Sequence, residues 1–152
     1  MSEAQQSFET QFRREPQYLS YCIELQTTLL EHTGSIYHPS LGGIFFPSGK
    51  KIAILNSKRG TLFYDDKFLP HVIAYTLQGQ KGDQDESHWK NKRLMDTEQV
   101  EYVYIYESYK VNGKPHYAYY GKYRYSGNKR RYDHVGSDGK MRKITTLLFL
   151  PA

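Results

Sequence analysis

The most constraining feature of the sequence is an alternating, tyrosine-rich segment that turns back on itself at Asn112-Gly113. Between residues 100 and 110, three tyrosines share one face of an extended chain, while Val103 and Ile105 share the other. Asn-Gly supplies the two positive-φ positions of a two-residue hairpin turn, so residues 115–125 are predicted to return as the second strand. The fold is therefore expected to be built on a β-sheet.

Several other apolar or β-branched runs are short and are separated by Pro-Ser-Gly or Arg-Gly turns, a pattern typical of closely spaced strands. They predict strands at residues 44–46, 51–56, 61–64, 72–76 and 144–150. The 15 Tyr and 7 Phe also favour pleated, half-buried surfaces. A polar stretch at residues 83–95 has room for a short helix. We predict an α+β fold, mainly β, with a curved sheet or open β-barrel and flanking helices.

The N-terminal part of the chain is predicted to be helical. Apolar residues recur at three- and four-residue steps from Leu19 to Leu30, after Pro16, which suits a first helical turn, and before Gly34, which suits the end. We expect one domain over residues 1–152, with a helical segment (1–34) packed on a β domain (35–152).

Charge divides along nearly the same line. Residues 1–33 hold five Glu and two Arg, a net charge of −3, whereas residues 34–152 hold 19 basic and 11 acidic residues, a net charge of +8. A single cysteine, Cys22, cannot form an intrachain disulfide and indicates a reducing compartment. The sequence shows neither a signal peptide nor an apolar run of membrane-spanning length, so a cytoplasmic, nucleoid-associated location is expected.

Motifs of common enzyme classes are absent from the sequence. The six histidines lack metal-ligand spacing, and there is no G-x-S-x-G elbow or zinc-binding cysteine pair. Asp83 and Glu86 could hold Mg²⁺, so a compact Mg-dependent nuclease stays open as an alternative. The stretch Gly79-Gln80-Lys81-Gly82 lacks the end of a P-loop, but it could contact a nucleic-acid phosphate through Lys81. No cofactor and no metal site are expected.

Residues 110–143 combine basic and aromatic side chains. They hold ten Lys or Arg against two Asp, interleaved with six tyrosines. Cations for phosphates and aromatic rings for bases are what a nucleic-acid surface needs, although the tyrosines could equally form a sheet core with the lysines in solvent. Lys129, Arg130 and Arg131 follow Ser-Gly-Asn and are predicted to form a positive tip in a turn that contacts the DNA backbone.

Short motifs in collinear order resemble a known family. They are His38-Pro39-Ser40-Leu41-Gly42-Gly43-Ile44, Phe63-Tyr64-Asp65-Asp66, Tyr75-Thr76-x-x-Gly79, Gly82-Asp83-Gln84, Asn91-Lys92-Arg93-Leu94 and Tyr119-Tyr120-Gly121-x-Tyr123. Over roughly residues 35–125 this order and spacing resemble the SRA (YDG) domain, a curved barrel of PUA-like architecture. That family recognises modified cytosine in DNA by flipping the base, and its bacterial relatives occur in modification-dependent restriction systems.

The resemblance implies a role for each of five pocket residues. Tyr75 matches the aromatic residue that stacks on the flipped base, and Phe63, helped by Tyr64, matches the opposing one. Asp66 matches the carboxylate that accepts from the cytosine amino group, and Thr76 matches a contact to the base edge. Such a slot offsets the few kcal/mol of stacking and pairing that flipping costs.

Leu41 matches an apolar side chain that enters the duplex where the base has left. Two departures limit the resemblance: Tyr-Asp-Gly becomes Tyr119-Tyr120-Gly121, and the insertion that reads the partner strand in eukaryotic members is missing before Gly82-Asp83-Gln84. A preference for hemimethylated CpG therefore does not carry over.

The predicted function is that of a modified-base reader that binds double-stranded DNA and directs a nuclease on the same or a partner chain. 5-Methylcytosine, hydroxymethylcytosine and bulkier modifications all stay open as the ligand. A PUA-like module that binds RNA or a protein is a second alternative, beside the nuclease.

Overall fold

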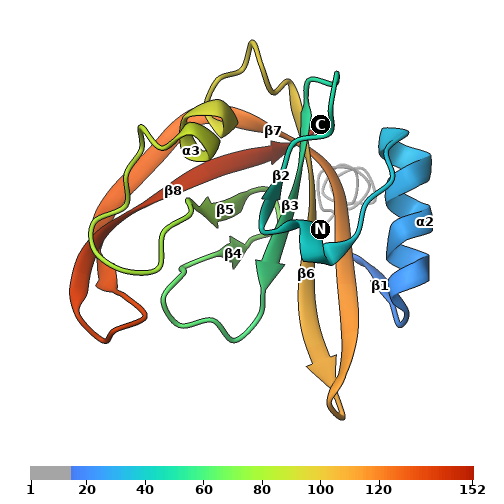
Figure 1. Ribbon diagram of the computed structural model, residues 1–152, viewed down its shortest axis with the longest axis horizontal. Helices are drawn as coiled ribbons and strands as arrows, with labels where there is room; N and C mark the ends of the chain where they lie inside the picture. The colour runs from blue at the N-terminus through green and yellow to red at the C-terminus, as the bar shows by residue number, and fades with distance from the viewer. Residues whose placement is uncertain (1–14) are drawn as a thin grey trace, which may run out of the picture.

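The computed structural model describes residues 15–152, which fold around one mixed sheet of eight strands (Figure 1). The strands are β1 (Gln17–Leu19), β2 (Ile44–Phe45), β3 (Ile52–Lys58), β4 (Lys67–Phe68), β5 (Ile73–Thr76), β6 (Tyr102–Val111), β7 (Lys114–Val135) and β8 (Met141–Pro151). Their order is β2-β3-β6-β7-β8-β5-β4, with β1 beside β7 off this path; β3 and β6 are parallel and the other pairs antiparallel. The sheet curves strongly and does not close, which confirms the predicted mainly β class.

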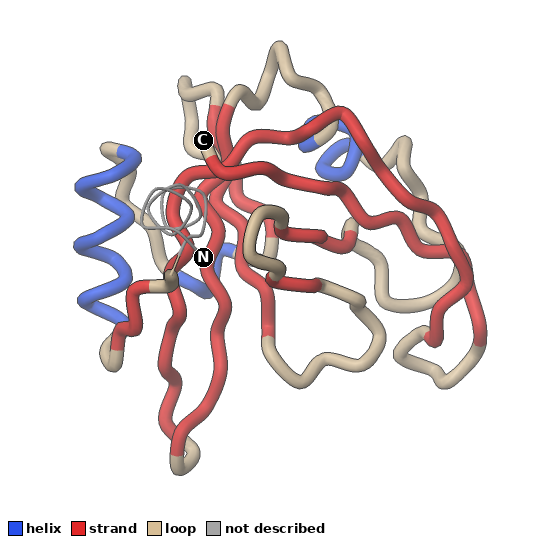
Figure 2. Tube along the Cα trace, turned by 180° about the vertical axis from the view of Figure 1, so that it is seen from behind, coloured by secondary structure: helices blue, strands red, loops and turns tan. Residues whose placement is uncertain are grey.

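The predicted hairpin is confirmed. Asn112 and Gly113 have φ angles of 51° and 78° and join β6 to β7. In both views of the whole chain this hairpin projects beyond the rest of the sheet (Figures 1 and 2).

Strand β7 is far longer than predicted. The expected end after Tyr125 is wrong, because the pairing with β8 resumes at Lys129 after a register shift and continues to Val135. Gly127, with φ 83°, lies inside this irregularity. The Ser-Gly-Asn sequence therefore marks a bulge within a strand, where a turn was predicted.

Helix α2 (Cys22–Thr33) confirms the N-terminal helix within the described residues. It begins later than predicted, because Pro16 precedes β1 instead of the first helical turn. Gly34 caps it in the left-handed conformation, and its N–H donates to the carbonyl of Leu30 at 2.8 Å. The remainder of the predicted segment, residues 1–14, lies outside the described residues.

The alternation of the hairpin has a structural cause, because both of its faces are covered. Leu25 and Leu29 of α2 pack on the tyrosine face, which is formed by Tyr104, Tyr106 and their neighbours on β7. The opposite face joins a second core lined by β3, β5 and β8. Helix α3 (Trp89–Leu94) confirms the short helix expected within 83–95.

One predicted strand is wrong. Residues 61–64 form a loop between β3 and β4, where Arg142 of β8 donates to the Phe63 carbonyl in place of a ladder of backbone hydrogen bonds. The two-residue strand β4 and the three-residue strand β1 were not predicted, and β1 occupies positions that were assigned to the N-terminal helical segment. No helix of residues 15–152 has the length and apolar character needed to cross a membrane.

Candidate functional site

A cavity of about 880 Å³ opens between the loop after β3, strand β5 and the β7–β8 hairpin. All five predicted pocket residues line it: Phe63, Tyr64, Asp66, Tyr75 and Thr76. The fold thus brings two predicted segments into one concave site, while their roles toward a base stay predictions. The other lining residues are Gly43, Asn56, Lys58, Arg59, Gly60, Thr61, Leu62, Gln78, Gln80, Val135, Gly136, Ser137 and Gly139.

The loop that carries Phe63 is fastened to the sheet through its neighbour Asp65. The N–H of Asp65 donates to Thr76 Oγ1 at 2.9 Å. The Tyr132 hydroxyl on β7 donates to Asp65 Oδ2 at 2.6 Å, and burial together with this contact raises the pKa of Tyr132 to about 12. Both bonds fix the loop that forms one wall of the cavity.

Asp66 is held by neutral donors. Its Oδ1 accepts from the N–H of Thr76 at 2.6 Å, and its Oδ2 accepts from the Ser57 hydroxyl at 2.7 Å. Burial raises the pKa of the Asp66 carboxyl, while these hydrogen bonds lower it in part. A carboxylate has about four acceptor positions, and these donors do not use all of them, so Asp66 can still accept a hydrogen bond from a ligand.

Tyr75 belongs to the cavity wall and to the hydrophobic core. It is 4% exposed, and its hydroxyl lies 3.0 Å from the carbonyl oxygen of Gly43 and 3.1 Å from that of Asn56. Phe63 and Tyr64 stand edge to face, with ring centroids 5.0 Å apart. The ring of Tyr75 is therefore fixed in place, and the cavity has aromatic groups from both of its predicted segments.

Arg142 is a residue of the site that the sequence did not reveal. It is 3% exposed, and its Nη2 donates to the carbonyl of Phe63 at 2.6 Å. Its Nη1 donates to the carbonyl of Gly79, with that of Gly82 further away at 3.4 Å. Burial lowers the pKa of this guanidinium. The sequence signal that could have indicated it is its position: Arg142 precedes Ile144 by two residues, so the two side chains lie on the same face of an alternating strand.

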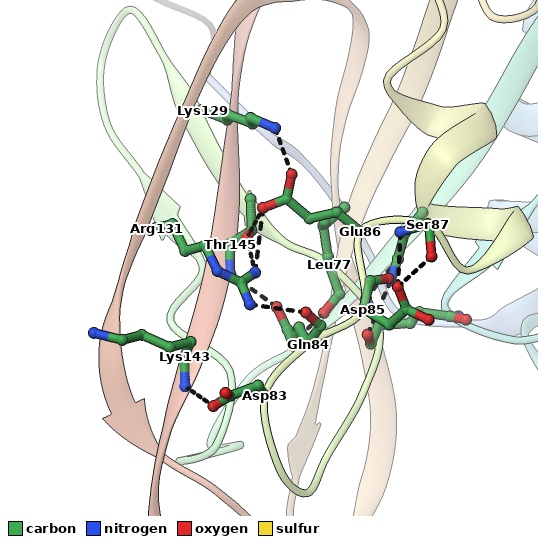
Figure 3. Close-up of polar contacts among 12 residues, drawn as sticks. Leu77, Asp83, Gln84, Asp85, Glu86, Ser87, Lys129, Arg131, Lys143 and Thr145 are labelled. Carbon is green, nitrogen blue, oxygen red and sulfur yellow. Dashed lines mark hydrogen bonds and ion pairs between the residues drawn. The ribbon is translucent and has the colours of Figure 1, made fainter.

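The predicted basic tip has a different structure. Lys129, Arg130 and Arg131 lie within strand β7, and Figure 3 shows two of them reaching toward Glu86. Lys129 Nζ pairs with one oxygen of Glu86, and Arg131 Nη1 lies 3.2 Å from the other. These cations, Lys129 first, lower the pKa of the Glu86 carboxyl.

Arg131 is tied down by two further bonds. Its guanidinium donates to Thr145 Oγ1 at 2.9 Å and to the carbonyl of Gln84 at 3.1 Å (Figure 3). The sequence could not show this pairing, because Glu86 is more than forty residues away from both cations.

Arg130 points the other way, since successive side chains of a strand alternate between faces. It lies opposite Thr146 of β8, which in turn lies opposite the cavity residue Thr76 of β5. Tyr132, next on this face, reaches Asp65. The side chain of Arg130 forms no hydrogen bond or ion pair with another residue of the described part of the chain. The basic triplet is thus divided, with only Arg130 on the cavity side.

Leu41 and Lys81 lie beside the cavity without lining it. Leu41 ends the short 3₁₀ helix η1 (Pro39–Leu41), is 44% exposed, and precedes the cavity residue Gly43 by two positions. Lys81 is exposed next to Gln80. Leu62 was not predicted as a site residue, but it lines the cavity, and it is 80% exposed.

The acidic residues considered for Mg²⁺ have other partners. Asp83 accepts from the N–H of Lys143 at 2.8 Å, and Glu86 is occupied as described. Within residues 15–152, no three His, Cys, Asp or Glu side chains gather as a metal site.

No protein-family model and no curated protein sequence matches the chain. Several solved structures match in fold. The sulfur-binding and SRA domains of ScoMcrA with phosphorothioated DNA share 14% identity at a TM-score of 0.56, over 90% of this chain and 39% of that one. The SUVH5 SRA complex with methylated CHH DNA shares 20% at 0.52, over 88% of both chains. The DNA recognition domain of the cytosine modification-dependent restriction endonuclease LpnPI shares 10% at 0.56, over 92% and 75%.

This chain therefore spans about two fifths of the matched ScoMcrA structure and nearly the whole of the SUVH5 domain. The open curvature and these matches agree with the resemblance in the sequence. The described residues have an SRA-like fold.

Proposed function

We propose that this chain is a recognition module that binds double-stranded DNA carrying a modified cytosine and receives the flipped base in its cavity. The observation that supports this most directly is the meeting of Phe63, Tyr75 and Asp66 around one cavity. Aromatic faces and a hydrogen-bond acceptor are what an extruded cytosine needs to replace its stacking and its pairing.

In this proposal Asp66 accepts from the exocyclic amino group, and Thr76 lies beside the base edge. Asp66 suits the role because its present donors are neutral, so no fixed cation competes with the base for the carboxylate. Tyr75 stacks on one side of the base, and Phe63 with Tyr64 stacks on the other. The volume of about 880 Å³ leaves space for a substituent on the cytosine ring.

Contacts outside the cavity complete the proposed complex. Leu41 fills the gap that the base leaves in the stack, as apolar wedges do in other DNA complexes. Arg130 and Lys81 contact phosphates beside the cavity. Lys129 and Arg131 contribute less, since Glu86 neutralises part of their charge.

We further propose that residues 1–152 form one recognition domain that guides a nuclease on the same polypeptide or on a partner chain, at the nucleoid. ScoMcrA and LpnPI are restriction endonucleases that contain domains of this fold beside other parts. The alternatives, an RNA-binding or interaction module and a compact nuclease, have no comparable observation in their favour.

The test is binding to otherwise identical duplexes that carry cytosine, 5-methylcytosine, 5-hydroxymethylcytosine or its glucosylated form. At least one modified duplex is expected to bind about tenfold or more tightly than the unmodified one, which corresponds to about 1.4 kcal/mol. Equal affinity for all four, or tighter binding of single-stranded RNA, would contradict the proposal. Cleavage of the DNA on addition of Mg²⁺ would favour the nuclease.

Base flipping has its own readout. With 2-aminopurine beside the preferred base, wild-type protein should raise the fluorescence as stacking is lost, and Leu41→Gly should bind more weakly. Leu69→Gly is the matched control, because Leu69 is also an exposed leucine but does not line the cavity. An unchanged fluorescence with wild-type protein would argue against flipping.

A further inference from the structure

We infer that Arg142 is the positioning residue of the cavity, and that Gly136, which has no side chain, leaves the space that the arginine occupies. This inference rests on the proposed function and adds to it the residue that sets the distance between two walls of the cavity. Arg142 does not line the cavity, so it acts through the segments it holds.

The first observation is where its hydrogen bonds go. The carbonyl of Phe63 belongs to the loop after β3, whereas Gly79 and Gly82 belong to the segment after β5. Two branches of one planar guanidinium therefore connect segments that carry Phe63 on one side and Gln78 and Gln80 on the other. A fork of fixed geometry holds two acceptors at a fixed separation, which an ammonium group cannot do.

The second observation is the kind of acceptor. All three acceptors are neutral carbonyls, and no carboxylate in residues 15–152 forms an ion pair with Arg142. Its Nε is buried and has no hydrogen-bond partner among the described residues. The charge of Asp138 acts on Arg142 without forming an ion pair with it. Burying a cation that no carboxylate pairs with directly is costly, so a purely structural strand position would be better filled by an apolar residue. What this arginine provides is a fixed separation between the two segments whose carbonyls it bonds.

The third observation is the space made for the side chain. A Cβ on Gly136 would lie 3.0 Å from Cδ and 3.2 Å from Nε of Arg142, and 3.2 Å from Oδ1 of Asp138. Gly136 itself lines the cavity at the β7–β8 hairpin, and its φ is not in the left-handed region that would require glycine. The close approach of Arg142, with Asp138 beside it, is therefore a structural reason for glycine here.

Two variants test the inference. Arg142→Met keeps an apolar stem and removes the guanidinium, whereas Gly136→Ala keeps the guanidinium and displaces it. Lys143→Met is the matched control, because it removes a positive charge from the next residue of β8, which is exposed and paired with Asp133. The readouts are the melting temperature and the ratio of affinities for the preferred modified duplex and the unmodified duplex.

Arg142→Met is expected to lower that ratio about tenfold with little change in binding to unmodified DNA, and Gly136→Ala is expected to lower it less. Lys143→Met should leave the ratio unchanged. A folded Arg142→Met that keeps the wild-type ratio would overturn the inference, and so would a normal ratio in Gly136→Ala if Arg142→Met does not fold. A wild-type protein that prefers no modified duplex would contradict the proposed function instead, independently of Arg142.

Discussion

Asp66 at the cavity and Glu86 outside it are both partly buried carboxylates, but their environments are opposite. Asp66 lies beside β5, and Glu86 lies beside the neighbouring strand β8. Asp66 accepts from a hydroxyl and a backbone N–H, and burial raises its pKa. Glu86 is paired with Lys129 and Arg131, and its pKa is lowered.

The difference separates a group available to a ligand from a group that serves the fold. A carboxylate with neutral partners retains its attraction for a donor that arrives later, whereas one between two cations has already satisfied its charge. The same reasoning applies to the cations. The side chain of Arg130, on the cavity side, has no polar partner among the described residues, whereas Lys129 and Arg131 are paired with Glu86. Polar contacts thus support the candidate site in one region and strand packing in the other.

The largest effects are expected when the aromatic side chains of the cavity are removed. Tyr75→Ala should lower the free energy of unfolding by about 3–5 kcal/mol, because the ring is part of the core as well as of the cavity wall. Phe63→Ala should leave stability nearly unchanged and cost about 1–3 kcal/mol of affinity for the modified duplex, through lost stacking. Chemical denaturation and duplex titration measure the two quantities.

Tyr75→Phe is the control that separates the ring from its hydroxyl. It retains the stacking face and loses the contacts to the carbonyls of Gly43 and Asn56. We expect it to bind almost as well as wild type. If Phe63→Ala kept full affinity and full preference for modified DNA, the aromatic slot would have to be assigned elsewhere.

The sequence predicted the elements that carry a local signal. The alternation before Asn112-Gly113 identified the central hairpin, and the nine-residue spacing from Asp66 to Tyr75 identified two segments that line one cavity. Contacts between distant residues could not be predicted this way. The ion pairs between Glu86 and β7 depend on the path of the loop after β5. The proposed role of Arg142 depends on backbone carbonyls of two segments that are distant from it in the sequence.

The misplaced turn shows the same limit. Gly127 reads locally as a turn residue, and only the presence of β8 alongside makes the segment a bulged strand. A basic triplet in a turn would present all its charges together, whereas a strand divides them between two faces.

A smaller effect is expected from the protonation of Asp66. Binding in the proposed mode needs the carboxylate, so affinity should fall as the pH is lowered, beginning above the usual pKa of an aspartate. The raised pKa in the folded state means that this group favours folding increasingly as the pH falls through that pKa, so its effects on binding and on stability have opposite signs.

Asp66→Asn should cost about 1–3 kcal/mol of discrimination between cytosine-type and thymine-type bases and should abolish this pH dependence. Asp65→Asn is the control, since Asp65 is adjacent but accepts from Tyr132. Titrations of labelled duplex from pH 8 down to about pH 4 provide the measurement. An equal pH dependence in Asp66→Asn and wild type would assign the titration to another group.

The smallest expected effect tests whether the two faces of β7 differ toward DNA. Each phosphate contact contributes about 0.9 to the slope of log affinity against log salt, so Arg130→Ala should reduce that slope by about one unit for modified and unmodified duplexes alike. The double change of Lys129 and Arg131 to Ala should reduce it less, because Glu86 already neutralises part of their charge. Glu86→Gln removes the negative charge that offsets both cations and should steepen the slope if that face lies within reach of the duplex. A double variant that lowers the slope by two units, with no effect of Arg130→Ala, would place the DNA on the Glu86 face of the strand.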